Sequence, residues 1–150
     1  MHKDVKVTKL LLEHGADVNA LDVYRSTPLH VASYEGAVSG IQALLKHGAT
    51  VNVRNDQGQT PLHYAIECGY VHAAWVLLEH GADTESPDVG GWAPLHFLSY
   101  QGGVEATELL LEYGANVHAQ NSKGKTPLQA ASAKGYHEIV QLLSKHAQSE

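Results

Sequence analysis

The stretch 59–69, QTPLHYAIECG, holds three side chains that could carry chemistry. Thr60 offers a hydroxyl, His63 an imidazole and Cys68 a thiol, all within nine positions. A cysteine and a histidine can act as nucleophile and base when their side chains lie within hydrogen-bond reach. In a helix, however, the five positions from His63 to Cys68 turn about 500° and rise about 7.5 Å, so the two side chains face different sides. This spacing argues against a Cys–His catalytic pair.

The eleven histidines of the chain raise the question of a metal site. Seven of them fall in two motifs that repeat along the sequence, three in the slot of His63 and four in the slot of His80. Equivalent slots in stacked helices lie about 8–10 Å apart, whereas zinc needs ligands that converge at about 2 Å. The sequence also lacks a glycine-rich phosphate-binding loop of the P-loop or dinucleotide type. We therefore predict no metal, no cofactor and no enzymatic activity.

Composition narrows the classes of function further. The 150-residue chain has a net charge of −6, which argues against nucleic acid or a membrane surface as the partner, because both attract clustered positive charge. Its apolar runs are far shorter than the roughly 18 residues of a membrane helix, and its start is not typical of a signal peptide. A single cysteine excludes an internal disulfide and fits a reducing compartment. We expect an intracellular protein, cytoplasmic or nuclear, that is monomeric alone and has no small-molecule substrate.

Three sequence markers share one period of 33 residues. The first is the motif Thr-Pro-Leu-His at Thr27 and Thr60, with the variants Ala-Pro-Leu-His at Ala93 and Thr-Pro-Leu-Gln at Thr126. The second is the motif His-Gly-Ala, whose glycines are Gly15, Gly48 and Gly81, with the variant Tyr-Gly-Ala at Gly114. The third is a lone glycine, found at Gly36, Gly69, Gly102 and Gly135. No insertion interrupts the period, so the chain is a tandem repeat.

Each marker has a physical role in a helical module. Threonine followed by proline is typical of a helix N-cap and first helical position. His63 lies three residues after Thr60, where it can hydrogen-bond back toward the cap as the acidic residue of a capping box does. The lone glycine ends this short helix, and the glycine of His-Gly-Ala ends a second one. Because neither helix can bury its apolar face alone, successive modules must stack.

This pattern resembles the ankyrin repeat. The period, the TPLHxA pattern from Thr60 to Ala65 and the LLEHGAD pattern from Leu77 to Asp83 carry the resemblance, which covers essentially the whole chain. It implies an all-α fold, an ankyrin-repeat solenoid of stacked helix–turn–helix modules with short β-turn or hairpin loops. We expect a single domain over residues 1–150, with a partial module typical of a fragment of a longer array, three full modules and a capping module. Their bounds are 1–21, 22–54, 55–87, 88–120 and 121–150.

The resemblance also implies where a partner protein binds. Ankyrin domains bind proteins through the turn tips and the exposed side of the first helix, which line a concave groove. Those slots are held here by Tyr24, Tyr34, Glu35, Asp56, Gln57, Gln59, Glu67, Trp92, Tyr100, Gln101, Lys123, Lys125 and Lys134. Tyrosine and tryptophan dominate binding hot spots, and the charges are acidic in the first two full modules and basic in the last. We expect two aromatic stations about 20 Å apart, Tyr24 beside Tyr34 and Trp92 beside Tyr100.

Four positions depart from the repeat. Trp75 stands where the other modules have glutamine or glutamate, so it is either a second contact patch or a ring that lies over neighbouring aliphatic stems. Arg25 replaces a turn glycine, which predicts a strained or reshaped turn. Leu98 replaces a small alanine, so the packing around it must adjust. Ala93 lacks the capping hydroxyl, which predicts that the third full module is the weakest interior one.

The sequence as a whole predicts a non-catalytic protein–protein interaction scaffold that binds a protein or peptide segment through the groove. One alternative is a regulatory segment that docks onto another domain of its own chain. An alternative from another class is a metal-binding or enzymatic domain, which stoichiometric zinc in the pure protein would indicate. A third is that the domain is itself a substrate, because by resemblance Asn19 and Asn52 occupy the slot that asparaginyl hydroxylases modify in family members.

Overall fold

The computed structural model describes the backbone of residues 2–148 and the side chains of residues 8–148, so the last two residues of the expected capping module lie outside it. The regular elements in this range are all helices, which confirms the predicted all-α class. They are α1 (His2–Glu13), α2 (Pro28–Tyr34), α3 (Val38–Lys46), α4 (Pro61–Glu67), α5 (Val71–Glu79), α6 (Pro94–Gln101), α7 (Val104–Glu112), α8 (Pro127–Lys134) and α9 (His137–Ala147). Across the described range, no helix has both the length and the apolar character needed to cross a membrane.

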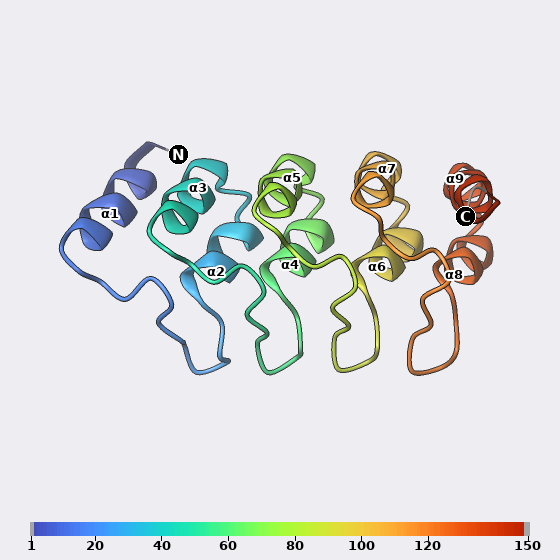
Figure 1. The fold of residues 1–150 in the computed structure, drawn as a ribbon, viewed down its shortest axis with the longest axis horizontal. Coiled ribbons are helices and arrows are strands. Elements are labelled where there is room, and N and C mark those ends of the chain that lie inside the picture. Colours follow the sequence, from blue (N-terminus) through green and yellow to red (C-terminus); the bar gives the residue numbers. More distant parts are fainter. Residues whose placement is uncertain (1, 149–150) are drawn as a thin grey trace. The chain divides into compact units, whose positions relative to one another are not determined.

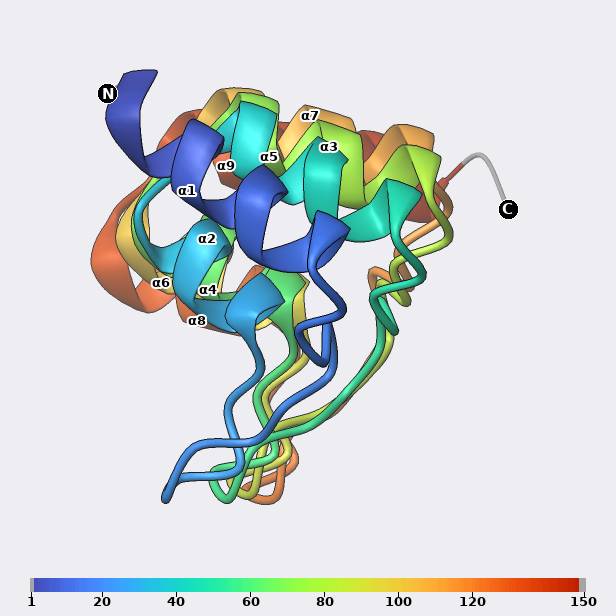
Figure 2. The same cartoon turned by 90° about the vertical axis from the view of Figure 1, so that its left-hand side faces the viewer.

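The chain divides into two compact units, unit 1 (Met1–Ala82) and unit 2 (Asp83–Glu150). In unit 1, α1, α3 and α5 lie side by side in one layer, and α2 and α4 form the other (Figure 1). The loops that precede α2 and α4 extend from the same side of these helices (Figure 2). In unit 2, α7 packs on α9 and α6 packs on α8. Each unit is therefore a stack of two-helix modules.

The first helix of a module begins where its threonine and the residue three positions later exchange hydrogen bonds. The hydroxyl oxygens of Thr27 and Thr126 accept from the backbone N–H groups of His30 at 3.4 Å and Gln129 at 3.3 Å. In return, the His30 ring and the Gln129 amide oxygen accept from the threonine N–H groups at 3.0 Å. Two donors that the helix itself cannot satisfy are thus paired. The capping prediction is confirmed at these helices.

The hairpin tips require left-handed backbone. Gly58, Gly91 and Gly124 have φ values of 71°, 74° and 69°, and Arg25 in the same slot has φ 59°. This conformation costs a non-glycine residue roughly 1–2 kcal/mol because its Cβ crowds the following carbonyl. The predicted strain at Arg25 is therefore confirmed.

The core of unit 2 accommodates Leu98 through a glycine. Leu98 is only 2% exposed although it stands where other modules have alanine. A Cβ built on Gly103 would lie 2.9 Å from Leu98 Cδ2, closer than real contacts allow. The other modules have alanine or tyrosine in the Gly103 slot. The predicted adjustment is confirmed, and it consists of a small residue at the start of α7.

Candidate partner-binding surface

In unit 1 the predicted contact residues lie on two hairpin tips and on α2 and α4. The Asp22 carboxylate accepts the N–H groups of Tyr24 at 2.9 Å and Ser26 at 2.7 Å, which fixes the first tip. The Asp56 N–H donates to the Tyr24 carbonyl at 3.1 Å, so the two tips are joined through the backbone. Most of the predicted residues here are exposed and Gln59 is half-buried; the exposed ones are Tyr24, Tyr34, Glu35, Asp56, Gln57 and Glu67.

The aromatic ring that contacts Tyr34 is Tyr64, which the sequence reasoning missed. The two rings meet edge to face with centroids 5.9 Å apart. The Tyr64 ring also packs on the His30 ring at 5.7 Å, and its hydroxyl accepts from the Asn55 side chain at 3.0 Å. Tyr64 is thereby held in one orientation beneath Tyr34. A signal was present, because the following module also has an aromatic residue, Phe97, in this slot.

The charged groups of this surface in unit 1 are mainly acidic. The Gln59 amide donates to the Glu67 carboxylate at 3.4 Å. Arg25 Nε lies 3.8 Å from Asp56 Oδ1, with both side chains largely exposed. Exposed pairs of this kind are worth little because water screens them. The surface therefore presents tyrosines among carboxylates.

In unit 2 the expected neighbourhood of Trp92 and Tyr100 is confirmed. Their rings meet edge to face at 5.6 Å, and Trp92 also lies 5.5 Å from the Phe97 ring. The Asp88 carboxylate accepts the Trp92 N–H at 2.8 Å and the Gly90 N–H at 2.8 Å, so the turn that carries the indole is fixed. Aromatic groups held rigidly at a surface provide large contact area at little cost in entropy.

One basic side chain contacts this aromatic group, and two more lie on the hairpin that precedes α8. Lys134 Nζ lies 3.7 Å from the centre of the Tyr100 ring, within cation–π range. The hydrogen bond and positive charge of Lys134 lower the pKa of the Tyr100 hydroxyl. The backbone N–H groups of Lys123 and Lys125 both donate to Asn121 Oδ1, at 2.9 and 3.1 Å. Both lysine side chains are exposed, as are Gln101 and Lys134.

The two surfaces are thus the tips and first helices of a repeated two-helix module. The family model "Ankyrin repeats (3 copies)" matches residues 1–88 and 85–150. The chain is an ankyrin-repeat protein. None of the curated proteins compared with it matches. Ankyrin repeats are generally protein–protein interaction modules and are typically not catalytic.

The histidines of this ankyrin-repeat protein hold its backbone. His30 Nδ1 accepts from the Thr27 N–H, so the ring proton is on Nε2, which donates to the Gln59 carbonyl at 3.0 Å. His96 makes the same bond to the Lys125 carbonyl at 3.0 Å. Each of these rings therefore links a helix cap to the hairpin of the next module. Burial, opposed by the Gln59 bond, lowers the pKa of His30.

The histidines of the His-Gly-Ala slot use the other ring nitrogen. Nδ1 of His14, His47 and His80 lies 2.8 Å from the carbonyl oxygen of the residue four positions earlier. Nδ1 of His146 lies 3.2 Å from the equivalent oxygen, that of Leu142. A carbonyl oxygen can only accept, so the proton is on Nδ1. These rings close the C-terminal turns of second helices. Within the described side chains, no group of three or more histidine, cysteine or acidic residues is placed to hold a metal ion.

Cys68 has little thiolate character. Burial and, secondarily, the Glu67 charge raise the pKa of its thiol. A protonated thiol is a poor nucleophile.

The structure places Trp75 and the two asparagines in unit 1. Trp75 is exposed on α5 and stacks on the His72 ring, with centroids 5.3 Å apart. The Asn19 side chain donates to the Gly48 carbonyl at 3.3 Å and accepts from the Thr50 N–H at 2.8 Å. The Asn52 amide donates to the Gly81 carbonyl at 3.0 Å. The asparagines therefore join the ends of successive modules.

Proposed function

We propose that this ankyrin-repeat protein is a non-catalytic scaffold that binds a protein or peptide through its hairpin tips and first helices. The observation that carries the proposal is the aromatic group of Trp92, Phe97 and Tyr100 in unit 2. Tyr100 is exposed and Trp92 is half-buried, and oriented rings of these two residue types are typical of binding hot spots. The single cysteine favours a cytoplasmic or nuclear location. We propose no nucleic-acid, membrane or small-molecule partner.

The charges of the two surfaces define the partner more closely. In unit 1 the tyrosines lie among Glu35, Asp56 and Glu67, which favour basic groups of the partner. In unit 2 one basic side chain contacts the Tyr100 ring and two others lie on the hairpin before α8, and these favour acidic groups of the partner. The basic side chains are those of Lys123, Lys125 and Lys134. A partner with a basic segment and an acidic segment would match both units.

Affinity for a captured partner tests the aromatic site. Trp92→Ala and Tyr100→Ala should each weaken binding about thirtyfold or more, because truncating a hot spot costs about 2 kcal/mol or more. Trp75→Ala is the matched control, since it removes an exposed tryptophan from α5. Circular dichroism should show unchanged helicity in all three variants. Unchanged affinity in the Trp92 and Tyr100 variants would place the binding site elsewhere, and a loss confined to Trp75→Ala would assign it to α5.

We also propose Asn19 and Asn52 as sites of asparaginyl hydroxylation. Both are accessible in part, and both lie where the hairpin joins successive modules. Mass spectrometry after incubation with a hydroxylase should show one added oxygen on the peptides that contain them. Unmodified peptides under conditions that modify a control ankyrin substrate would exclude this role.

A further inference from the structure

Unit 2 shows what the tyrosine at the end of a first helix can hold. Lys134, on α8, places its ammonium group 3.7 Å from the centre of the Tyr100 ring, on α6. A cation over the face of an aromatic ring is attracted by the negative charge of the π system. The tyrosine and the lysine occupy set positions of successive modules, so the repeat gives an equivalent place to other pairs of stacked first helices.

In unit 1 the equivalent place has the ring, but a thiol stands where unit 2 has the ammonium group. Tyr34 lies two repeats before Tyr100 and is 59% exposed, compared with 48% for Tyr100. Cys68 lies two repeats before Lys134 and supplies no positive charge. Neither α2 nor α4 has a basic residue in its last turn, whereas α8 has Lys134 there.

A carboxylate adjoins this place. Glu67 is the last residue of α4 and directly precedes Cys68. It follows Tyr64 by three positions, and residues at this spacing are neighbours on a helix surface. The Tyr64 ring in turn meets the Tyr34 ring edge to face at 5.9 Å, and the Gln59 amide donates to the Glu67 carboxylate at 3.4 Å. We call the place formed by Tyr34, Tyr64 and Glu67 the Tyr34 site.

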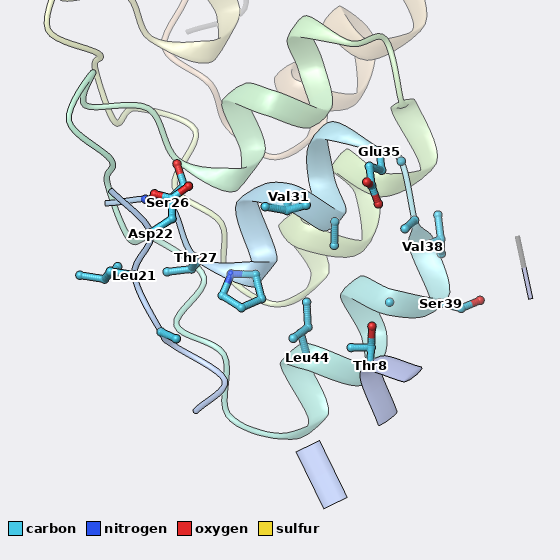
Figure 3. A pocket seen from close by; sticks show the side chains of 16 residues that line it. Thr8, Leu21, Asp22, Ser26, Thr27, Val31, Glu35, Val38, Ser39 and Leu44 are labelled. Carbon is cyan, nitrogen blue, oxygen red and sulfur yellow. Dashed lines mark hydrogen bonds between the residues drawn. The ribbon is translucent and has the colours of Figure 1, made fainter. Parts of the chain in front are cut away.

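The Tyr34 site is separate from the open cavity that α1, α2 and α3 border. The residues that line that cavity all lie between Thr8 and Leu44, and Glu35 is one of them (Figure 3). The Tyr34 ring instead faces α4, through its contact with Tyr64. Both helices that form the site therefore belong to the described chain.

The two arginines of the chain make their contacts at the hairpin tips. Arg25 Nε lies 3.8 Å from Asp56 Oδ1, and Arg54 Nε donates to the Gly58 carbonyl at 3.1 Å. These hairpins precede α2 and α4, whereas the Tyr34 site lies where the two helices end. The ring and the carboxylate of the site thus remain open to a cation from another molecule.

We propose that the Tyr34 site binds an arginine side chain of the partner protein. The guanidinium would stack on the Tyr34 ring, in the position that Lys134 takes over Tyr100, and would donate to the Glu67 carboxylate. Arginine suits both contacts, because its planar group stacks on aromatic rings and pairs with carboxylates through two N–H groups. This inference rests on the proposed function, since it names the partner group that the unit 1 surface takes.

A capped Gly-Arg-Gly peptide, titrated into the full chain at high millimolar concentration and followed by NMR, tests the site. The ring signals of Tyr34 and the amide signal of Cys68 should move. The matched control is the peptide with citrulline in place of arginine, which has nearly the same shape and no charge and should bind about fivefold more weakly. The Tyr100 ring is an internal control, because Lys134 already lies over it, and its signals should stay in place.

Three variants assign the response to the named groups. Glu67→Gln removes the charge with little change in shape, Tyr34→Leu removes the ring, and each should weaken binding of the arginine peptide about threefold. Cys68→Lys supplies the ammonium group that α8 provides in unit 2, so it should abolish the response. Glu79→Gln, which removes an exposed carboxylate at the end of α5, is the matched control and should bind like wild type. Amide spectra should show that all four variants keep the wild-type fold.

Three results would overturn the proposal. They are equal binding of the arginine and citrulline peptides, equal shifts of the Tyr34 and Tyr100 rings, and undiminished binding to Cys68→Lys. The proposed function has a separate test, because Trp92→Ala reports on unit 2. If the peptide failed while Trp92→Ala still weakened binding of a captured partner, the arginine site alone would be rejected. If the peptide bound as expected and Trp92→Ala had no effect on the partner, the arginine site would stand and the proposed aromatic site would be rejected.

Discussion

Ala93 offers a direct test of how much a capping hydroxyl contributes in this chain. Its backbone, at φ −74° and ψ 159°, already has the extended conformation of Thr27 at φ −93° and ψ 167°. The His96 ring accepts the Ala93 N–H at 3.2 Å, but alanine has no oxygen to accept from the His96 N–H. That N–H bonds instead to the Ala93 carbonyl at 2.9 Å. Ala93→Thr would therefore give the His96 N–H a better acceptor, but this N–H already has a hydrogen-bond partner in the wild-type chain.

This geometry sets the expected gain. A cap is worth about 0.5–2 kcal/mol, and the existing bond of the His96 N–H places the gain near the lower end, at about 0.5–1 kcal/mol. For a chain of this length the melting temperature should rise by about 1–4 °C. The same reasoning predicts that Thr126→Ala loses a comparable amount, because Thr126 makes the complete reciprocal pair.

Denaturant unfolding followed by Trp92 fluorescence, in a Trp75→Phe background, reports on unit 2 alone. Ala93→Val is the matched control, since valine has the shape of threonine without the hydroxyl. The free energy of unfolding should rank Ala93→Thr above wild type and above Ala93→Val. If the threonine and valine variants were equally stable, packing and not capping would govern this position, and the argument would be refuted.

Three further predictions follow from the structure. Arg25→Gly should raise the free energy of unfolding by about 0.5 kcal/mol, because relief of the left-handed strain exceeds the loss of an exposed ion pair and the added chain entropy. Gly124→Arg, in the same slot with open space around it, should lower the free energy of unfolding by about 1 kcal/mol. If urea unfolding showed a change of the same sign in both variants, this reasoning would be contradicted. The pKa of His30 is lowered in the folded state, so the unfolded state takes up this proton first as the pH falls. The stability contributed by the neutral ring is therefore complete above about pH 6.5 and is lost as the pH falls toward the folded pKa. His30→Gln should flatten this fall between about pH 7.5 and pH 5.5, and an unchanged slope would show that other groups cause it. Replacing Lys123, Lys125 and Lys134 by glutamate should slow association with a captured partner at low salt, as measured by surface plasmon resonance, and a rate that does not change would remove the case for an acidic partner segment.

The sequence could predict the parts of this fold that are set locally. Thr27 and Thr126 cap helices because their bonding partners lie three residues away. Gly124 lies at a turn position whose left-handed φ of 69° favours glycine. The neighbourhood of Trp92 and Tyr100 could be predicted for the same reason, since both residues belong to one module.

Features that depend on contacts between helices were harder to predict from the sequence. Tyr64 meets Tyr34 only because α2 and α4 stack, and the one sequence signal, the aromatic Phe97 in the same slot of the next module, does not indicate which ring it contacts. Room for Leu98 comes from Gly103, the N-cap of α7 in the same module, and no sequence motif connects these two positions. The exposure of Leu11 could not be predicted from its own residue type, because the same leucine in α3 and α5 is buried by a neighbouring helix.

The two sets of histidines can serve as natural NMR probes of module opening, because their rings are held in different tautomers. Rings in the slot of His30 carry their proton on Nε2, and rings in the slot of His47 carry it on Nδ1. In ¹⁵N spectra the protonated and unprotonated ring nitrogens resonate far apart, so the two tautomers are distinguishable without substitution. A module that opens would let its rings exchange between tautomers, and the signals of that slot would converge while those of intact modules stayed separate. Opening of individual modules could therefore be followed through the imidazoles at the caps of α2, α4 and α6 and at the C-terminal ends of α1, α3, α5 and α9.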